Sequence, residues 1–172
     1  MTQPRSSKLL PVPSGLEQWA VRLESETMAH SDLNELLSAL LRMAETLLAD
    51  QGTFLPIGAI MLSNGEIRHV GAQIEGEEYP GAQPLLELLT NTFQKEAAQG
   101  KLRAAGIAYD VLTVPPGRQR KQDAICCSLE HFLGEAVDVF KPYARTEDGH
   151  VQFEEIFASN RTQQFFRQLP RG

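Results

Sequence analysis

Cysteine is scarce in this chain of 172 residues, because there are only two, Cys126 and Cys127, and they are adjacent. Neighbouring residues of a strand point to opposite faces of a sheet, so the pair suits neither a framework disulfide nor joint chelation of a metal. The four histidines also lack the spacing of a zinc site. The sequence therefore predicts two buried reduced thiols, no metal and no cofactor.

Long hydrophobic runs are absent as well. No segment approaches the length of a membrane span, and residues 1–13 lack the apolar core of a secretory signal, so we expect a cytoplasmic protein without membrane contact. Positive charge is in deficit, since 16 Lys and Arg stand against 22 Asp and Glu and give a net charge of −6. This balance argues against nucleic acid as a partner. The usual enzyme signatures, such as a phosphate-binding glycine loop or a nucleophile elbow, are missing too.

The start of the chain differs in composition from the rest. Residues 1–30 are predicted to be a flexible N-terminal extension, because the first thirteen include three prolines among polar residues and bury little. Apolar residues at helical spacing indicate a short helix at 15–26 within it. Residues 31–169 are expected to form a single α+β domain.

The clearest element of that domain is a helix over Leu33–Ala49. Its leucines form one broad stripe, which favours packing on a sheet over a coiled coil. Ser31 or Asp32 is expected to cap its N-terminus, and Gly52 follows its end.

A β-hairpin is predicted next, with strands Phe54–Leu62 and Glu66–Gln73. Its turn contains Asn64-Gly65, a pair that tolerates the positive φ angles of a tight reversal. Pairing across a two-residue turn sets Leu62 opposite Ile67 and Ile60 opposite His69.

A second helix, three strands and a tail complete the expected order. The apolar spacing predicts the helix at Pro84–Gln99 and strands at Ala104–Val114, Asp123–Phe132 and Glu135–Tyr143. Placing Gly134 in the left-handed position of a short loop sets the last register, with Leu129 opposite Val137, Cys127 opposite Val139 and His131 opposite Glu135. The phenylalanine-rich tail is expected to add a short strand and a docking helix.

The predicted fold is thus α+β, with a central antiparallel sheet of about five or six strands and helices on its faces. The element order over Leu33–Phe166 resembles that of the roadblock and profilin-like layered folds. Folds of that kind often serve as association platforms, so the resemblance implies a role in protein association.

Four residues of the last predicted hairpin are the best candidates for catalysis: Ser128, Glu130, His131 and Asp138. Glu130 and Asp138 are expected to be diagonal neighbours on one face, close enough for each charge to shift the pKa of the other. His131 points to the opposite face, so an acid–base trio would need a bulge or another register. The structural alternative is a hairpin end stabilised by a pair between His131 and Glu135.

A basic loop offers a candidate anion site at Arg118, Arg120 and Lys121. The alternative is a loop whose charge serves solubility alone.

Three classes of function stay open at this point. The leading hypothesis is a non-enzymatic interaction or adaptor-type protein that associates through a sheet edge or its leucine-rich helix, as a homodimer or with another protein. A small acid–base enzyme using Glu130 and Asp138 is the first alternative. A small-ligand sensor with a pocket between sheet and helix is the second.

Overall fold

The computed structural model describes residues 14–78 and 80–166, with side chains from Thr27 onward. Two helices and a seven-stranded antiparallel sheet form this part of the chain, which confirms the α+β class with a central sheet. In chain order the elements are α1 (Ser14–Gln51), β1 (Ile57–Leu62), β2 (Ile67–Val70), α2 (Ala82–Ala98), β3 (Leu102–Thr113), β4 (Gln122–His131), β5 (Ala136–Arg145), β6 (Val151–Phe153) and β7 (Phe157–Asn160).

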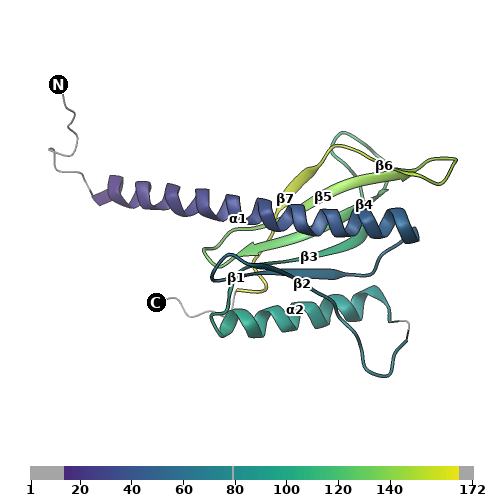
Figure 1. The fold of residues 1–172 in the computed structure, drawn as a ribbon. Helices are drawn as coiled ribbons and strands as arrows, with labels where there is room; N and C mark the ends of the chain where they lie inside the picture. The colour runs from purple at the N-terminus through teal and green to yellow at the C-terminus, as the bar shows by residue number, and fades with distance from the viewer. Residues whose placement is uncertain (1–13, 79, 167–172) are drawn as a thin grey trace.

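The sheet runs in the order β2-β1-β3-β4-β5-β6, and β7 pairs with β5 beside β6. The expected five or six strands become seven because the tail contributes two short ones. Helix α1 lies across one face and α2 lies against the other, so the two helices enclose the strands between them (Figure 1). No helix in the described part of the chain combines the length and the apolar character that crossing a membrane requires.

Helix α1 packs on the sheet through the predicted leucine stripe. Leu36, Leu40 and Leu48 are buried in one core with side chains of β1, β3, β4 and β5. The helix does not begin at Ser31 or Asp32, as expected, but runs without a break from Ser14 to Gln51. At 1.5 Å per residue it is about 57 Å long, and its first turns project past the sheet (Figure 1). The division into an extension and a domain stays a prediction.

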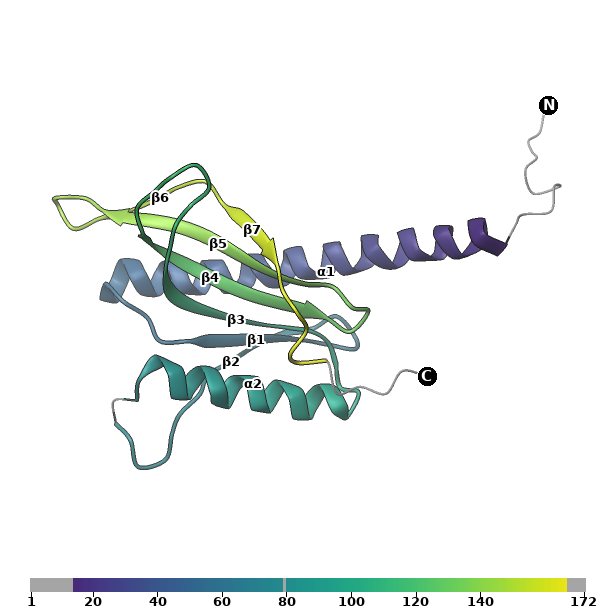
Figure 2. The ribbon, with the colours of Figure 1, turned by 180° about the vertical axis from the view of Figure 1, so that it is seen from behind.

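Helix α2 covers only part of the opposite face. Its buried residues are Leu85, Leu89, Phe93 and Ala97, a spacing of four that puts them on one stripe against β1 and β3. Phe165 packs edge-on against Phe93, with ring centroids 5.5 Å apart. After β7 the chain descends past the sheet to α2 (Figure 2), so the segment 161–166 completes this layer.

Two glycines allow the helices to approach the sheet closely. A Cβ atom on Gly58 would lie 2.6 Å from the Phe93 ring of α2. A Cβ atom on Gly106 would lie 2.8 Å from Leu40 of α1 and 2.7 Å from Leu129. These distances are shorter than van der Waals contact, so each helix rests against bare backbone at these points.

The register of the first hairpin differs from the prediction by one residue. Met61, not Leu62, lies opposite Ile67, and Ala59, not Ile60, lies opposite His69. The N–H of Gly65 donates to the carbonyl of Leu62, and Gly65 has a positive φ angle of 89°. The loop therefore has three residues instead of two, which moves every pair by one position.

The register of the last hairpin agrees with the prediction. Leu129 pairs with Val137 and Cys127 with Val139, and the backbone of His131 bonds that of Glu135. Gly134 has a φ angle of 120°, which glycine tolerates best. The expected docking helix is absent from residues 151–166, which hold β6, β7 and an irregular segment, and the rest of that prediction lies outside the described residues.

Candidate functional site

Three of the four catalytic candidates share one face of the β4–β5 hairpin. Ser128 lies directly opposite Asp138, and Glu130 is the next residue of β4 on that face. The Ser128 hydroxyl donates to Asp138 Oδ1 at 2.6 Å. Tyr109 of β3 places its hydroxyl 3.2 Å from Ser128 Oγ. Because the proton of Ser128 goes to the carboxylate, Tyr109 is positioned to donate to Ser128.

Arg161, which the sequence analysis did not single out, joins the two predicted carboxylates. Its Nη2 lies 3.0 Å from Glu130 Oε2, and its Nη1 lies 3.1 Å from Asp138 Oδ1. The guanidinium also lies over the Phe165 ring, 5.5 Å from the centroid. The expected proximity of Glu130 and Asp138 is therefore real, but a shared cation neutralises part of their repulsion.

Glu130 is fully buried and acts as an anchor for the C-terminal segment. Its oxygens accept the backbone N–H groups of Gln164 and Phe165 at 2.8–2.9 Å, in addition to the ion pair with Arg161. Both oxygens of this carboxylate are occupied by fixed donors and have no access to solvent. Glu130 thus holds the segment 161–166 against the sheet.

A cavity of about 600 Å³ opens beside this hairpin. Three walls surround it: the sheet, one side of α2 and the segment after β7. Its lining residues are Gln83, Leu86, Glu87, Thr90, Asn91, Ile107, Tyr109, Ser128, Asp138, Arg161, Thr162, Gln164 and Phe165. Its size falls in the range of small-ligand sites, which are about 300–1,000 Å³.

Much of the polar lining is not used inside the protein. The side chains of Thr90, Asn91 and Thr162 make no hydrogen bond to other described residues. The Nε atom of Arg161 is buried and lacks a partner within the described chain. Buried donors are normally satisfied, so this atom is a point where a ligand or water would bind.

His131 lies on the other face of the sheet, inside the α1 layer. Its Nε2 is 2.7 Å from Asp32 Oδ2, and its Nδ1 accepts the N–H of Leu133 at 3.2 Å. The side chain does not pair with Glu135, so that expectation was wrong; the reason is that Asp32 reaches it from α1. Because Nδ1 is an acceptor, the proton is on Nε2, directed at Asp32.

Asp32 also receives two hydrogen bonds from Arg103 of β3, both at 2.7 Å. Burial acts to raise the pKa of Asp32, but the hydrogen bonds from Arg103 and His131 outweigh burial and hold the pKa below its ordinary value. This network links α1, β3 and the β4–β5 turn. It has the geometry of a structural clamp, with the carboxylate's oxygens occupied by fixed donors.

The two thiols are free and buried, on opposite faces of β4. Burial raises the pKa of Cys126 to about 11. Burial also raises the pKa values of Cys127 and of Tyr109. Thiols in this state are protonated at neutral pH, so neither cysteine is activated as a nucleophile.

The basic loop has one paired cation and two exposed ones. Arg118 pairs with Glu154 at 2.6 Å and donates to Gln122 at 2.7 Å, while Arg120 and Lys121 are exposed. The candidate anion site stays a prediction, with one of its three cations already engaged. Among the described residues, no group of three His, Cys, Asp or Glu side chains is arranged to hold a metal ion.

Comparison of the chain with protein-family models, with curated proteins and with solved structures found no match. The resemblance to the roadblock and profilin-like folds therefore stays a prediction.

Proposed function

We propose that this protein is a non-enzymatic domain that binds a small polar ligand in the cavity beside α2. The observation that carries the proposal is the cavity itself, which has a suitable volume and is lined by polar side chains from three separate parts of the chain. Side chains on rigid strands and on a helix hold fixed positions, which favours selective binding. A cytoplasmic location is part of this proposal, and the two free, buried thiols are compatible with it.

Acid–base catalysis is the less well supported alternative. Of the predicted acidic and basic candidates, only Asp138 lines the cavity. Glu130 is enclosed by its donors, and His131 is buried on the opposite face of the sheet. A general acid–base mechanism needs a titrating group within reach of the substrate, and this arrangement offers a single carboxylate with an arginine already paired to it.

A screen of a chemically diverse small-molecule library tests the proposal, with the thermal unfolding of the whole chain as the readout. A ligand present at about one hundred times its Kd adds about 2.7 kcal/mol of stability, which raises Tm by roughly 5–10 °C in a domain of this size. Thr90→Trp fills part of the cavity and should abolish this shift. Lys95→Trp places the same side chain on α2 outside the cavity and should preserve it. The absence of hits, or hits that bind Thr90→Trp as well as the unchanged protein, would refute ligand binding in this cavity.

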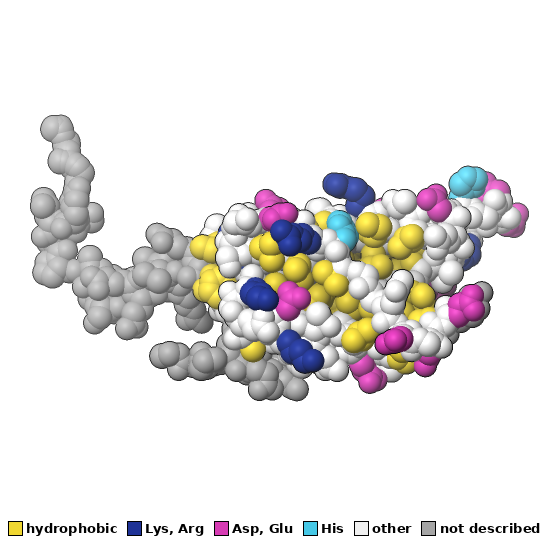
Figure 3. Space-filling view, turned by 60° about the horizontal axis from the view of Figure 1, so that its bottom comes forward, with side chains coloured by type: hydrophobic (Ala, Val, Ile, Leu, Met, Phe, Trp, Pro, Cys, Tyr) yellow, Lys and Arg dark blue, Asp and Glu magenta, His cyan; other side chains and the backbone are white. Residues whose placement is uncertain are grey.

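Association through a sheet edge is a second proposal. Of the two surfaces suggested by the sequence, the leucine stripe of α1 is buried against the sheet. A sheet edge remains, and the proposal concerns the edge at β2, which has a neighbour on one side only within the described chain. Hydrophobic side chains lie across the middle of the α2 side of the molecule, with charged side chains spaced around them (Figure 3).

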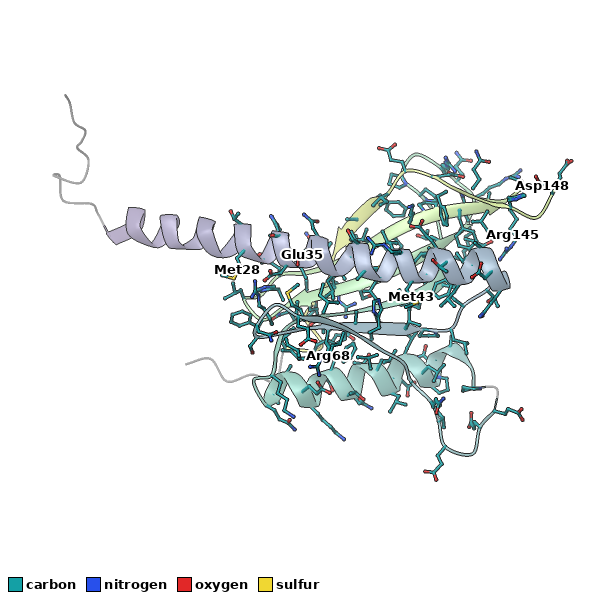
Figure 4. All side chains as sticks on the ribbon, in the orientation of Figure 1. Met28, Glu35, Met43, Arg68, Arg145 and Asp148 are labelled. Carbon is teal, nitrogen blue, oxygen red and sulfur yellow. The ribbon has the colours of Figure 1, made fainter. Side chains whose placement is uncertain are left out.

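Arg68 projects from the middle of β2 on the side of α2 and pairs with Glu66 at 3.2 Å (Figure 4). Charged residues on edge strands oppose uncontrolled pairing, so a homodimer through β2 would be sensitive to the residue at this position. Sedimentation equilibrium across a concentration series measures the mass of the protein in solution and so tests for this homodimer. A dimer that dissociates in Arg68→Pro supports the proposal, and a strict monomer at all concentrations rejects it.

A further inference from the structure

We propose that the ligand of the cavity is a small organic cation that carries an ammonium or guanidinium group. This inference rests on the proposed function and adds the chemical class of the ligand. It follows from two properties of the cavity: the balance of charge around it, and the kind of hydrogen-bonding groups that its walls leave unused.

The charge around the cavity is negative. Glu87 and Asp138 line it, and Glu130 lies directly behind Arg161. Arg161 is the one cation among the lining residues, so two carboxylates and one guanidinium line the cavity, an excess of one negative charge, and the buried Glu130 behind Arg161 raises the excess to two. Two of the three guanidinium nitrogens already bind Glu130 and Asp138. An anionic ligand would therefore meet a cation whose charge is compensated. A cationic ligand would meet Glu87, which pairs with no cation in the described chain, and Asp138, which shares Arg161 with Glu130.

The hydrogen bonds that join Tyr109, Ser128, Asp138 and Arg161 leave a carboxylate acceptor unused. Tyr109 is positioned to donate to Ser128, which donates to Asp138 Oδ1, and Arg161 Nη1 donates to the same oxygen. Within the described chain, Asp138 Oδ2 is not used by these bonds. A ligand that brings N–H donors fits such a set of acceptors.

Glu87 supplies a second acceptor on the helix wall. Gln83 donates to its Oε2 at 3.3 Å, and Oε1 is left over. The hydroxyl and amide groups of Thr90, Asn91 and Thr162 are unused donors. In the segment after β7, the buried Nε of Arg161 is a further donor without a partner in the described chain. A cationic ligand that also presents one oxygen or nitrogen acceptor toward Arg161 would satisfy this donor as well.

Binding of a matched four-carbon series to the whole chain tests the inference. Diaminobutane and agmatine are cations, butanediol has the same chain length without charge, and succinate carries two negative charges. Isothermal titration calorimetry is expected to give binding of at least one of the two amines, tighter than that of butanediol by about tenfold or more, the range of a charge-assisted hydrogen bond. Succinate is expected not to bind. The affinity of the amine should fall as salt is added.

Two variants test the carboxylates separately. Asp138→Asn keeps an oxygen for Ser128 and Arg161 and should weaken the amine by about tenfold or more. Glu87→Gln removes a charge from an exposed helix position and should weaken it by about two- to fivefold. Glu96→Gln makes the same change nine residues along α2, on the opposite side of the helix, and should leave the affinity unchanged. If Asp138→Asn fails to fold, Glu87→Gln and the salt dependence still decide the question.

The inference is overturned if butanediol or succinate binds as tightly as the amines, or if neither amine binds at millimolar concentration. The proposed function survives that result when library compounds of another class bind and lose affinity in Thr90→Trp. Both proposals fail when no compound of any class binds the cavity.

Discussion

Replacement of Glu130 by alanine should destabilise the protein severely. This carboxylate is fully buried and binds Arg161 and the amides of Gln164 and Phe165. Its removal leaves two backbone donors without their acceptor and an arginine with one carboxylate instead of two. Breaking a buried charge pair from one side costs about 3–5 kcal/mol. The free energy of unfolding of a native domain is only about 5–15 kcal/mol, so this loss is a large fraction of the stability.

Urea unfolding followed by circular dichroism measures this loss. With a denaturant slope of about 2 kcal/mol per M, a loss of about 4 kcal/mol lowers the midpoint by about 2 M. Glu135→Ala is the control, since Glu135 is a carboxylate of the same hairpin at a partly exposed position, and its effect should stay within about 0.5 kcal/mol.

Hydrogen exchange separates a local effect from a global one. The amides of Gln164 and Phe165 should lose their protection in Glu130→Ala under conditions in which the amides of β4 remain protected. A loss of less than about 1 kcal/mol, together with unchanged exchange at these two amides, would refute the role of Glu130 as the anchor of the C-terminal segment.

Three further outcomes follow from single residues. Asp32→Asn should lower the stability by about 1–3 kcal/mol at neutral pH. Because the folded-state pKa of Asp32 is below 3.8, the stability difference between variant and unchanged protein should persist down to pH 3.8 and disappear only below it. Acid-titrated unfolding measures this, and a stability difference that disappears at higher pH would contradict it. Burial raises the pKa of Cys126 to about 11, so iodoacetamide at mildly alkaline pH should label this thiol slowly in the native protein and quickly in urea. Mass spectrometry measures the labelling, and fast labelling of the native protein would argue against a buried, protonated thiol. Gly106→Ala should lower the stability by about 1–3 kcal/mol through overpacking, as measured by thermal unfolding. Gly71→Ala is the control, because Gly71 has open space around it, and equal effects of the two variants would be inconsistent with close helix–sheet contact.

The sequence predicted the elements best where local signals and burial agreed. The β4–β5 register followed from alternating apolar residues together with Gly134, because one side of each strand had to be buried. The β1–β2 register failed because Asn64-Gly65 suits both a two-residue and a three-residue loop, and both arrangements bury apolar residues.

Long-range contacts set the limits of the prediction. Asp32 has the chemistry of a helix cap, but its carboxylate binds Arg103 and His131, which are 71 and 99 residues away along the chain. The role of Arg161 was not predicted, because its partner Glu130 lies far away in the sequence, on β4, and nothing in the local sequence of Arg161 distinguishes it from a surface arginine. The polar face with Ser128 and Asp138 was predictable from alternation, whereas the cavity needed the positions of α2 and the C-terminal segment.

The glycines at positions 58 and 106 have a mechanical consequence. They sit on the adjacent strands β1 and β3, where Gly58 pairs with Ile107 and Gly106 with Ala59, and they face opposite helices. At each point a helix side chain already contacts bare backbone, so neither helix can move closer to the sheet unless side chains repack. The contact at Gly58 therefore opposes any narrowing of the cavity by an inward movement of α2, and the glycine sets the minimum spacing between α2 and the sheet.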